Sequence, residues 1–126
     1  MLSTETSSSS PEAIAAAAAT QAATTQTPQF FIVYANLVDG VSWCGDCRAA
    51  EPVVEAKFGQ GKEAAGLGVY FAGDREVWRK ADNPWRKWGV PALPTLYKVT
   101  PDGTWSSLVE AEVYDQKKLD AFVDGQ

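Results

Sequence analysis

Seven consecutive residues, Gln29 to Ala35, read QFFIVYA and form an almost uninterrupted run of apolar and aromatic side chains. A strand with one face in water alternates apolar and polar residues, whereas a strand covered on both faces is apolar throughout. The run therefore predicts a central β-strand with other elements packed on both of its faces. A sheet that leaves one face in water does not accommodate such a strand.

Helices and further strands surround this run in the sequence. Ser10 is placed to cap a helix, with Pro11 in its first position, and the alanine-rich segment continues that helix to about residue 23. The other segments that we expect are, in chain order, a loop at 36–42, a helix from about Cys47 to residue 58, a strand at 66–74, one or two short helical turns within 75–90 that are broken near Asn83 and Pro84, strands at 93–99 and 105–110 joined by a turn at 101–104, and a helix at 116–124 capped by Asp115.

This order of elements predicts an α/β fold, with a central mixed β-sheet flanked by helices. We assign residues 11–126 to a single domain. The Ser/Thr-rich residues 1–10 are expected to form a disordered tail in front of it.

Composition excludes several classes of function. Of the 126 residues, 45% are hydrophobic, which is enough for one ordinary core, and the formal net charge of −5 argues against general affinity for nucleic acid or an anionic membrane. No stretch approaches the roughly 20 apolar residues of a membrane-spanning helix. The first basic residue is Arg48, so the start of the chain lacks the basic segment of a signal or transit peptide. We therefore expect a cytoplasmic monomer that binds neither nucleic acid nor membrane.

The only two cysteines, Cys44 and Cys47, stand close together in the sequence WCGDC. A zinc site usually needs four Cys or His ligands, and this chain has no histidine and no second cysteine pair, so we expect no metal. A structural disulfide across so short a loop would restrict the unfolded chain very little. The spacing and the position before a helix favour a redox-active pair instead.

The chemistry expected of this pair follows from its position. The beginning of a helix stabilises a thiolate through its unpaired N–H groups and the positive end of its dipole. Cys44 would then attack a substrate disulfide. Cys47, one turn along the helix, would resolve the resulting mixed disulfide.

The residues around the pair resemble the thioredoxin domain-containing protein 17 family, also described as fourteen-kilodalton thioredoxin-related proteins and, in plants, as Clot proteins, within the thioredoxin-fold superfamily. The family motif WCPDC, followed by a segment like AEPVV, is similar to residues 43–47 and 50–54. The resemblance extends from residue 29 to 124. Its other matching positions are Trp78, Asn83, Arg86, Lys87, Val90, Ala92, Pro94, Thr95 and residues 108–112.

The resemblance implies a thioredoxin-like fold and a cytosolic disulfide reductase with no bound cofactor. Family members receive electrons from NADPH through thioredoxin reductase and reduce small disulfides such as cystine and disulfide-containing proteins. Carried over to this chain, Cys44 is the nucleophile and Cys47 the resolving thiol. Pro94 matches the cis-proline opposite the active site, and Leu93 offers its backbone to the substrate. Trp43 is expected to flank the active-site sulfur.

Two positions depart from the pattern. Gly45 stands where the family usually has proline, which should alter the balance between disulfide and dithiol; we count it among the substrate-binding residues. Tyr34 falls where thioredoxins have a buried aspartate on the central strand. We therefore expect Asp46, Glu51 or water to take the proton from Cys47, and we assign Asp46 to the catalytic residues. The negative charge of Asp46 would oppose a thiolate at Cys44.

Alternative interpretations remain open at this point. The same fold serves general thioredoxins and disulfide isomerases, and a non-enzymatic binding module would use the cysteine pair only as a redox-sensitive latch. Four basic residues in this acidic chain form either a solvated face or a docking site for an acidic partner. They are Arg79, Lys80, Arg86 and Lys87.

Overall fold

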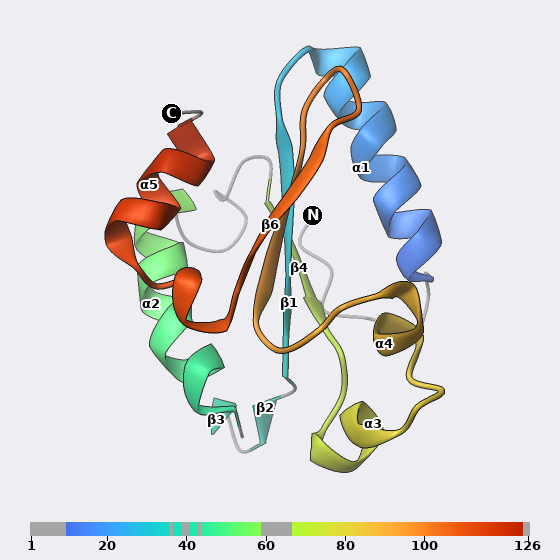
Figure 1. The fold of residues 1–126 in the computed structure, drawn as a ribbon, viewed down its shortest axis with the longest axis vertical. Helices are drawn as coiled ribbons and strands as arrows, with labels where there is room; N and C mark the ends of the chain where they lie inside the picture. Colours follow the sequence, from blue (N-terminus) through green and yellow to red (C-terminus); the bar gives the residue numbers. More distant parts are fainter. Residues whose placement is uncertain (1–9, 36, 39–40, 43, 59–66, 125–126) are drawn as a thin grey trace.

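The computed structural model describes residues 10–35, 37–38, 41–42, 44–58 and 67–124. A four-stranded sheet in the order β4-β1-β5-β6 forms the middle layer. Helices α1, α3 and α4 lie on one side of this sheet and α2 and α5 on the other (Figure 1). The strands are β1 Gln29–Tyr34, β2 Leu37–Val38, β3 Val41–Ser42, β4 Leu67–Phe71, β5 Thr95–Val99 and β6 Trp105–Val109; the helices are α1 Pro11–Thr25, α2 Gly45–Phe58, α3 Arg75–Arg79, α4 Pro84–Trp88, the 3₁₀ helix η2 Glu110–Glu112 and α5 Gln116–Asp124.

Strand β1 is central, as its uniform hydrophobicity predicted. It pairs in parallel with β4 and antiparallel with β5, so the predicted mixed sheet flanked by helices is confirmed. Successive side chains of β1 point to opposite layers. Phe30 packs edge-on against Phe58 of α2, with ring centroids 5.1 Å apart, while Phe31 lies 6.0 Å from Trp85 of α4. Both faces of the strand are therefore covered by aromatic side chains, each worth about 1.5–3 kcal/mol when fully buried.

Helix α1 is longer than its sequence predicts. The Ser10 side chain accepts a hydrogen bond from the backbone N–H of Ala13 at 3.1 Å, which confirms the predicted cap. The helix continues past residue 23 to Thr25 and stops at Gln26, which has φ 59. Ile14 and Ala22 are buried, so the small side chains of α1 bring the helix close to the sheet. Residues 1–9 lie outside the described residues, and their predicted disorder stays a prediction.

Three strand boundaries differ from those expected, two of them for a clear local reason. The strand predicted at 66–74 ends at Phe71, because Gly73 turns with φ 122 and Asp74 caps α3; residue 66 lies outside the described residues. The strand predicted at 105–110 ends at Val109, because Glu110 has φ 54 and begins η2. The strand predicted at 93–99 begins at Thr95.

The segment 36–42 was expected to be a loop, which is wrong for residues 37–38 and 41–42, while residues 36, 39 and 40 lie outside the described residues. The structure has two short strands there, β2 and β3, with Leu37 opposite Ser42 and Val38 opposite Val41. The sequence signal for them is the Asp-Gly dipeptide at 39–40 between apolar residues, which is typical of a two-residue hairpin turn.

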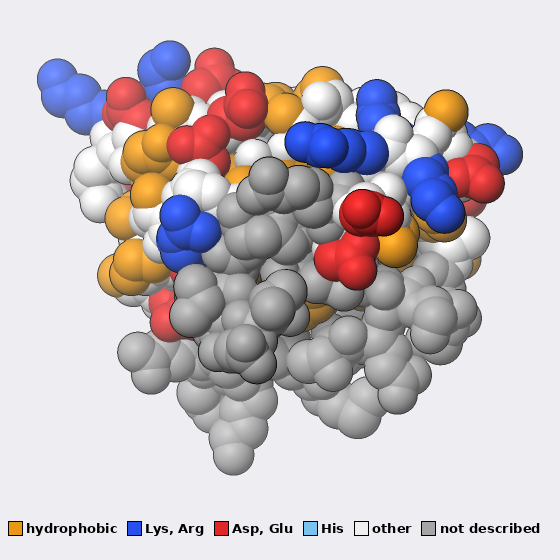
Figure 2. Space-filling model, turned by 90° about the horizontal axis from the view of Figure 1, so that it is seen from below, with side chains coloured by type: hydrophobic (Ala, Val, Ile, Leu, Met, Phe, Trp, Pro, Cys, Tyr) orange, Lys and Arg blue, Asp and Glu red, His pale blue; other side chains and the backbone are white. Residues whose placement is uncertain are grey.

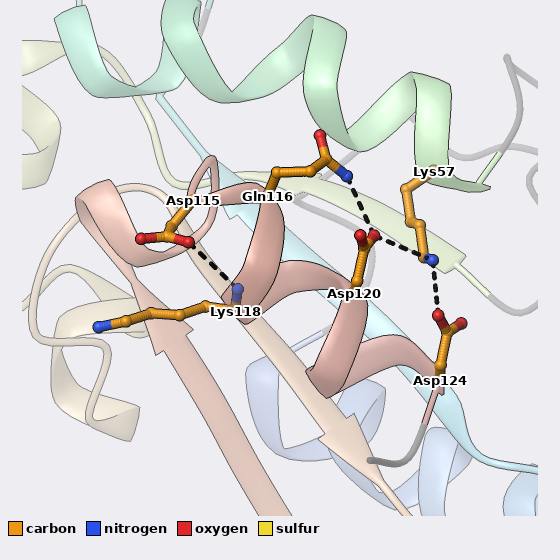
Figure 3. A network of polar contacts seen from close by, with 6 residues as sticks. All are labelled: Lys57, Asp115, Gln116, Lys118, Asp120 and Asp124. Atoms are coloured by element: carbon orange, nitrogen blue, oxygen red, sulfur yellow. Dashed lines mark hydrogen bonds and ion pairs between the residues drawn. The ribbon is translucent and has the colours of Figure 1, made fainter.

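The remaining helices agree with the predicted pattern. Helices α3 and α4 are separate, and Asn83 caps α4 where the break was expected. Asp115 accepts from the backbone N–H of Lys118 at 3.2 Å and so caps α5, also as expected. Lys57 near the end of α2 then joins two carboxylates of α5, Asp120 at 3.1 Å and Asp124 at 2.9 Å (Figure 3). This ion pair network ties α2, whose first turn contains Cys47, to α5.

Candidate active site

Cys44 and Cys47 lie at the start of α2. Cys44 immediately precedes the helix, and its carbonyl accepts the helical hydrogen bond from Arg48 N–H at 3.0 Å. The backbone N–H of Cys47 donates to Cys44 Sγ at 3.2 Å. Both cysteines are present as thiols. Cys44 therefore occupies the position of a helix N-cap, with sulfur in place of the usual hydroxyl or carboxylate oxygen.

The two sulfurs differ in accessibility. Cys44 keeps 9% of its surface exposed and Cys47 only 1%. Cys47 Sγ points toward the end of β1, where it accepts from Ala35 N–H at 3.5 Å. This arrangement suits the predicted roles, an outer sulfur that meets the substrate and an inner one that resolves.

The surroundings of Cys44 favour its thiolate. Hydrogen bonds from the Cys47 thiol and, more weakly, from the Cys47 backbone N–H lower the pKa of Cys44 to about 7. Burial and the charge of Asp46 oppose this shift in the pKa of Cys44. Because a free cysteine has a pKa of about 8.5, Cys44 is ionised to a much larger extent near neutral pH than an ordinary thiol.

Leu93 and Pro94 lie opposite Cys44, as the resemblance implied. The Leu93–Pro94 peptide bond is cis. The Cys44 thiol donates to the Leu93 carbonyl oxygen at 3.5 Å, which joins the start of α2 to the segment just before β5. Both residues are buried.

A groove of about 480 Å³ opens beside Cys44. Predicted site residues Gly45, Asp46 and Leu93 line it, whereas the predicted Trp43 lies outside the described residues. The sequence did not identify the other walls as parts of the site. The complete lining is Cys44, Gly45, Asp46, Trp78, Arg79, Pro91, Ala92, Leu93 and Glu110.

One further residue reaches the site from a distant part of the sequence. The Tyr114 hydroxyl donates to Asp46 Oδ1 at 2.7 Å, across 68 positions of the chain. Nothing in the sequence around Tyr114 indicates this contact. This hydrogen bond from Tyr114 thus fixes the position of the Asp46 carboxylate.

Tyr34 is the last residue of β1. It is buried, and desolvation together with the charges of Glu51, Cys47 and Glu55 raises its pKa well above the ordinary value of a tyrosine. A phenol that stays protonated at neutral pH does not accept a proton from Cys47. The match of Tyr34 to the aspartate position of thioredoxins stays a prediction.

The basic residues of α3 and α4 have different surroundings. The Arg86 guanidinium lies over the Trp78 ring at 5.5 Å and donates to the carbonyl oxygens of Trp78 and Arg79 at 3.3 and 2.8 Å. Arg86 thus caps the C-terminal end of α3, while Arg79 lines the groove and Lys80 and Lys87 are exposed. Basic and acidic side chains are interspersed at this end of the molecule, in the half that is not grey (Figure 2).

Two other properties bear on function. Among the described residues, no group of three or more His, Cys, Asp or Glu side chains is arranged to hold a metal ion. Among the helices that the structure describes, none has both the length and the hydrophobicity of a membrane-spanning segment.

Comparisons with known proteins agree with this geometry. The family described as thioredoxin domain-containing protein 17-like, thioredoxin domain, matches residues 11–124. The match begins earlier than the resemblance noted in the sequence motifs, so α1 is part of the family's domain.

Three relatives show how far the sequence similarity extends. The chain is 33% identical to the thioredoxin-like protein Clot of Arabidopsis thaliana over 67% of this chain and 65% of that protein. It is 32% identical to Clot of Oryza sativa over 75% of this chain and 73% of that protein. It is 39% identical to thioredoxin domain-containing protein 17 of Homo sapiens over 58% of each. The chain thus spans less than two thirds of the Arabidopsis and human relatives.

Solved structures show the same architecture. Thioredoxin O1 from Arabidopsis thaliana in its oxidized state superimposes with a TM-score of 0.52 at 24% identity, over 90% of this chain and 92% of that one. Trxlp from Edwardsiella tarda gives a TM-score of 0.53 at 20% identity, over 85% and 91%. At these identities the similarity shows the fold, which is that of thioredoxin.

Proposed function

The chain belongs to the thioredoxin domain-containing protein 17-like family, and from this premise we propose that it is a disulfide reductase that uses Cys44 and Cys47. The family, the fold and the CxxC pair support a thiol-redox role. The observation that carries the proposal further is the contact of Cys47 N–H with Cys44 Sγ at 3.2 Å, beside an open groove. This contact supports a stabilised thiolate at a position that a substrate can reach.

The first step is the attack of the Cys44 thiolate on one sulfur of the substrate disulfide. A bond forms between Cys44 Sγ and that sulfur while the substrate's S–S bond breaks, and the other sulfur leaves as a thiolate that takes up a proton. The lowered pKa of Cys44, to about 7, supports this role, since the thiolate is the attacking species. The backbone at Leu93 and Pro94 and the residues Trp43 and Gly45 are the proposed substrate contacts.

The second step releases the remaining half of the substrate. Cys47 loses its proton and attacks Cys44 Sγ, the mixed disulfide breaks, and the second substrate thiolate leaves. Two electrons have then passed to the substrate, and a Cys44–Cys47 disulfide remains. Tyr34 stays protonated, and we propose that Asp46, Glu51 or water accepts the Cys47 proton, with Asp46 as the residue that we assign to this role.

Regeneration needs an external reductant. We propose that thioredoxin reductase supplies it from NADPH, that the chain itself needs no bound cofactor, and that it acts as a monomer in the cytoplasm. Small disulfides such as cystine and disulfide-containing proteins are the proposed substrates. These expectations come from the family resemblance, and the groove beside Cys44 is large enough for a small disulfide.

The proposal predicts NADPH consumption when thioredoxin reductase, this protein and cystine are combined. The Cys44→Ser protein should lose this activity, because it lacks the attacking sulfur. The Cys47→Ser protein is its matched control: it should lose turnover but accumulate mixed disulfides with the substrate, which mass spectrometry detects. Normal turnover by Cys44→Ser would refute the assignment.

Insulin as a second substrate separates the alternatives. Turnover of cystine with little activity on insulin supports a reductase with a narrow site, and equal turnover of both indicates a general thioredoxin. No turnover of either substrate, with the reductase shown to be active on a control, indicates a redox-sensitive latch.

A further inference from the structure

Tyr114 lies in the short turn between η2 and α5. Its neighbours fix its position: Val113 is fully buried, with its N–H bonded to the Glu110 carbonyl at 3.0 Å, and Asp115 caps α5. The side chain of Tyr114 reaches across to the first turn of α2, where its hydroxyl donates to Asp46 Oδ1 at 2.7 Å. The turn after η2 thus holds the side chain of Asp46, a residue that lies between the two cysteines in the sequence.

The charge held in this way acts on Cys44. Asp46 lines the groove beside Cys44, and its carboxylate opposes ionisation of the thiol. Other charged or titratable groups also face this region. They are the Cys47 thiol and Tyr114 itself, Glu110 and Arg79 on the groove walls, and Arg48, whose Nη2 lies 3.6 Å from where a Cβ on Gly45 would be.

We propose that Tyr114 is a positioning residue, which orients the Asp46 carboxylate and draws part of its charge away from Cys44. A hydroxyl that donates to a carboxylate oxygen places its positive end against the negative charge, and this reduces the field of the carboxylate at nearby groups. The inference concerns the same site as the proposed reductase, and the biological role that it gives Tyr114 rests on that proposed function. Its physical content, a link from Tyr114 through Asp46 to Cys44, does not require turnover.

The hydrogen bond persists over the pH range in which Cys44 ionises. The bond to Asp46, above all, raises the pKa of Tyr114 above the ordinary tyrosine value. The phenol therefore keeps its proton throughout neutral and mildly alkaline pH. Any change in Cys44 reactivity across this range reports on Cys44 and not on titration of Tyr114.

The test is the rate at which iodoacetamide alkylates Cys44 in the reduced protein as a function of pH, with the modified residue assigned by mass spectrometry. Tyr114→Phe removes only the hydroxyl. At pH 6.5 we expect it to slow alkylation of Cys44 about threefold, which corresponds to a rise of about half a unit in the pKa of Cys44. At pH 9.5, where the thiol is ionised in both proteins, the rates should agree.

The decisive comparison introduces Tyr114→Phe into the Asp46→Asn protein. The amide that Asp46→Asn introduces still accepts a hydrogen bond from Tyr114 but carries no charge. Alkylation at pH 6.5 should be faster in this variant than in the wild type. Adding Tyr114→Phe to it should cause no further change, because no carboxylate is left to position.

A matched control is Tyr97→Phe, which removes the hydroxyl of a tyrosine on β5, away from the start of α2; it should leave the pH profile unchanged. Unfolding curves of every variant report whether it is folded. An unchanged or faster rate in Tyr114→Phe overturns the proposal, and so does an equal slowing when Tyr114→Phe is added to Asp46→Asn. Since no reductase or disulfide substrate is present, failure here is distinct from failure of the proposed reductase activity.

Discussion

At the scale of single residues, the reactivity of Cys44 depends chiefly on its neighbour Cys47. The hydrogen bond from the Cys47 thiol is the largest of the influences that lower the pKa of Cys44 to about 7. Cys47→Ala removes this donor and leaves the backbone N–H of residue 47. The pKa of Cys44 should therefore rise, and its alkylation at pH 6.5 should become several-fold slower than in the wild type.

Cys47→Ser is the matched variant, because a serine hydroxyl still donates a hydrogen bond. It should retain more of the wild-type rate at pH 6.5 than Cys47→Ala does. Equal pH profiles for the wild type and Cys47→Ala would contradict the prediction, since they would mean that the Cys47 side chain does not influence Cys44.

The residues of the site that could be predicted are those with a local motif or a family pattern. Cys44 and Cys47 stand out as the only cysteines, and Leu93 and Pro94 were assigned from the resemblance. Tyr114 could not be predicted in the same way. Its contact with Asp46 spans 68 positions and depends on how the turn after η2 packs against α2, which no local pattern encodes.

At the scale of secondary-structure elements, the side chain of Asn83 connects the end of β4, α3 and α4. It is 3% exposed, and its amide donates to the carbonyl oxygens of Ala72 after β4 and Val77 of α3 at 2.8 and 3.2 Å. Its side-chain oxygen accepts from Trp85 N–H and Arg86 N–H at the start of α4, at 2.9 and 3.3 Å. The Asn83 side chain thus satisfies backbone groups between residues 72 and 86. This segment includes Trp78 and Arg79, which line the groove.

Asn83→Ala should lower the free energy of unfolding by about 2–4 kcal/mol, because it leaves buried backbone groups without their partners. Urea denaturation of the reduced protein measures this loss. The adjacent Asp82→Ala, at an exposed position, is the control and should change stability by no more than about 0.5 kcal/mol. Similar losses in the two variants would contradict the role of Asn83.

The elements themselves could be predicted where composition or capping residues are distinctive. The apolar run of β1, the caps at Ser10 and Asp115 and the break near Asn83 and Pro84 all led to correct elements. The β2–β3 pair was missed because two-residue strands carry too few side chains for a recognisable period. The end of β6 was missed because glutamate at residue 110 gives no indication of its positive φ.

At the scale of the whole molecule, the Cys44 thiolate contributes to stability as well as reactivity. A group whose pKa is lower in the folded than in the unfolded state stabilises the fold above its unfolded pKa, and this contribution is lost as the pH falls through the folded value. For Cys44 these limits are about 7 in the folded protein and about 8.5 in the unfolded chain.

The reduced protein should therefore become more stable relative to Cys44→Ser as the pH rises from 6.5 to 8.5. Unfolding of both proteins in urea at several pH values, with reductant present, measures the difference. Parallel pH dependence in the two proteins would contradict the prediction. Tyrosines with raised pKa values, such as Tyr97, affect stability only at higher pH.

The overall architecture followed from the sequence because β1 is so distinctive and its neighbours in sequence include recognisable helices. The groove did not follow, because its walls come from α2, α3, the segment before β5 and Glu110, which are separate in sequence. Hydrophobic patterns identify what is buried, but they do not specify which exposed residues meet at one end of the sheet.

The near-complete burial of Cys47 affects how long a captured partner stays attached. Cys47 lies one turn from Cys44, so its attack releases a molecule bonded to Cys44 by a displacement within the first turn of α2. Such a step has the high effective concentration of an intramolecular reaction and is independent of how much free thiol the surroundings contain. If the proposed reductase mechanism holds, this intramolecular step limits the lifetime of each mixed disulfide even where no external thiol is present.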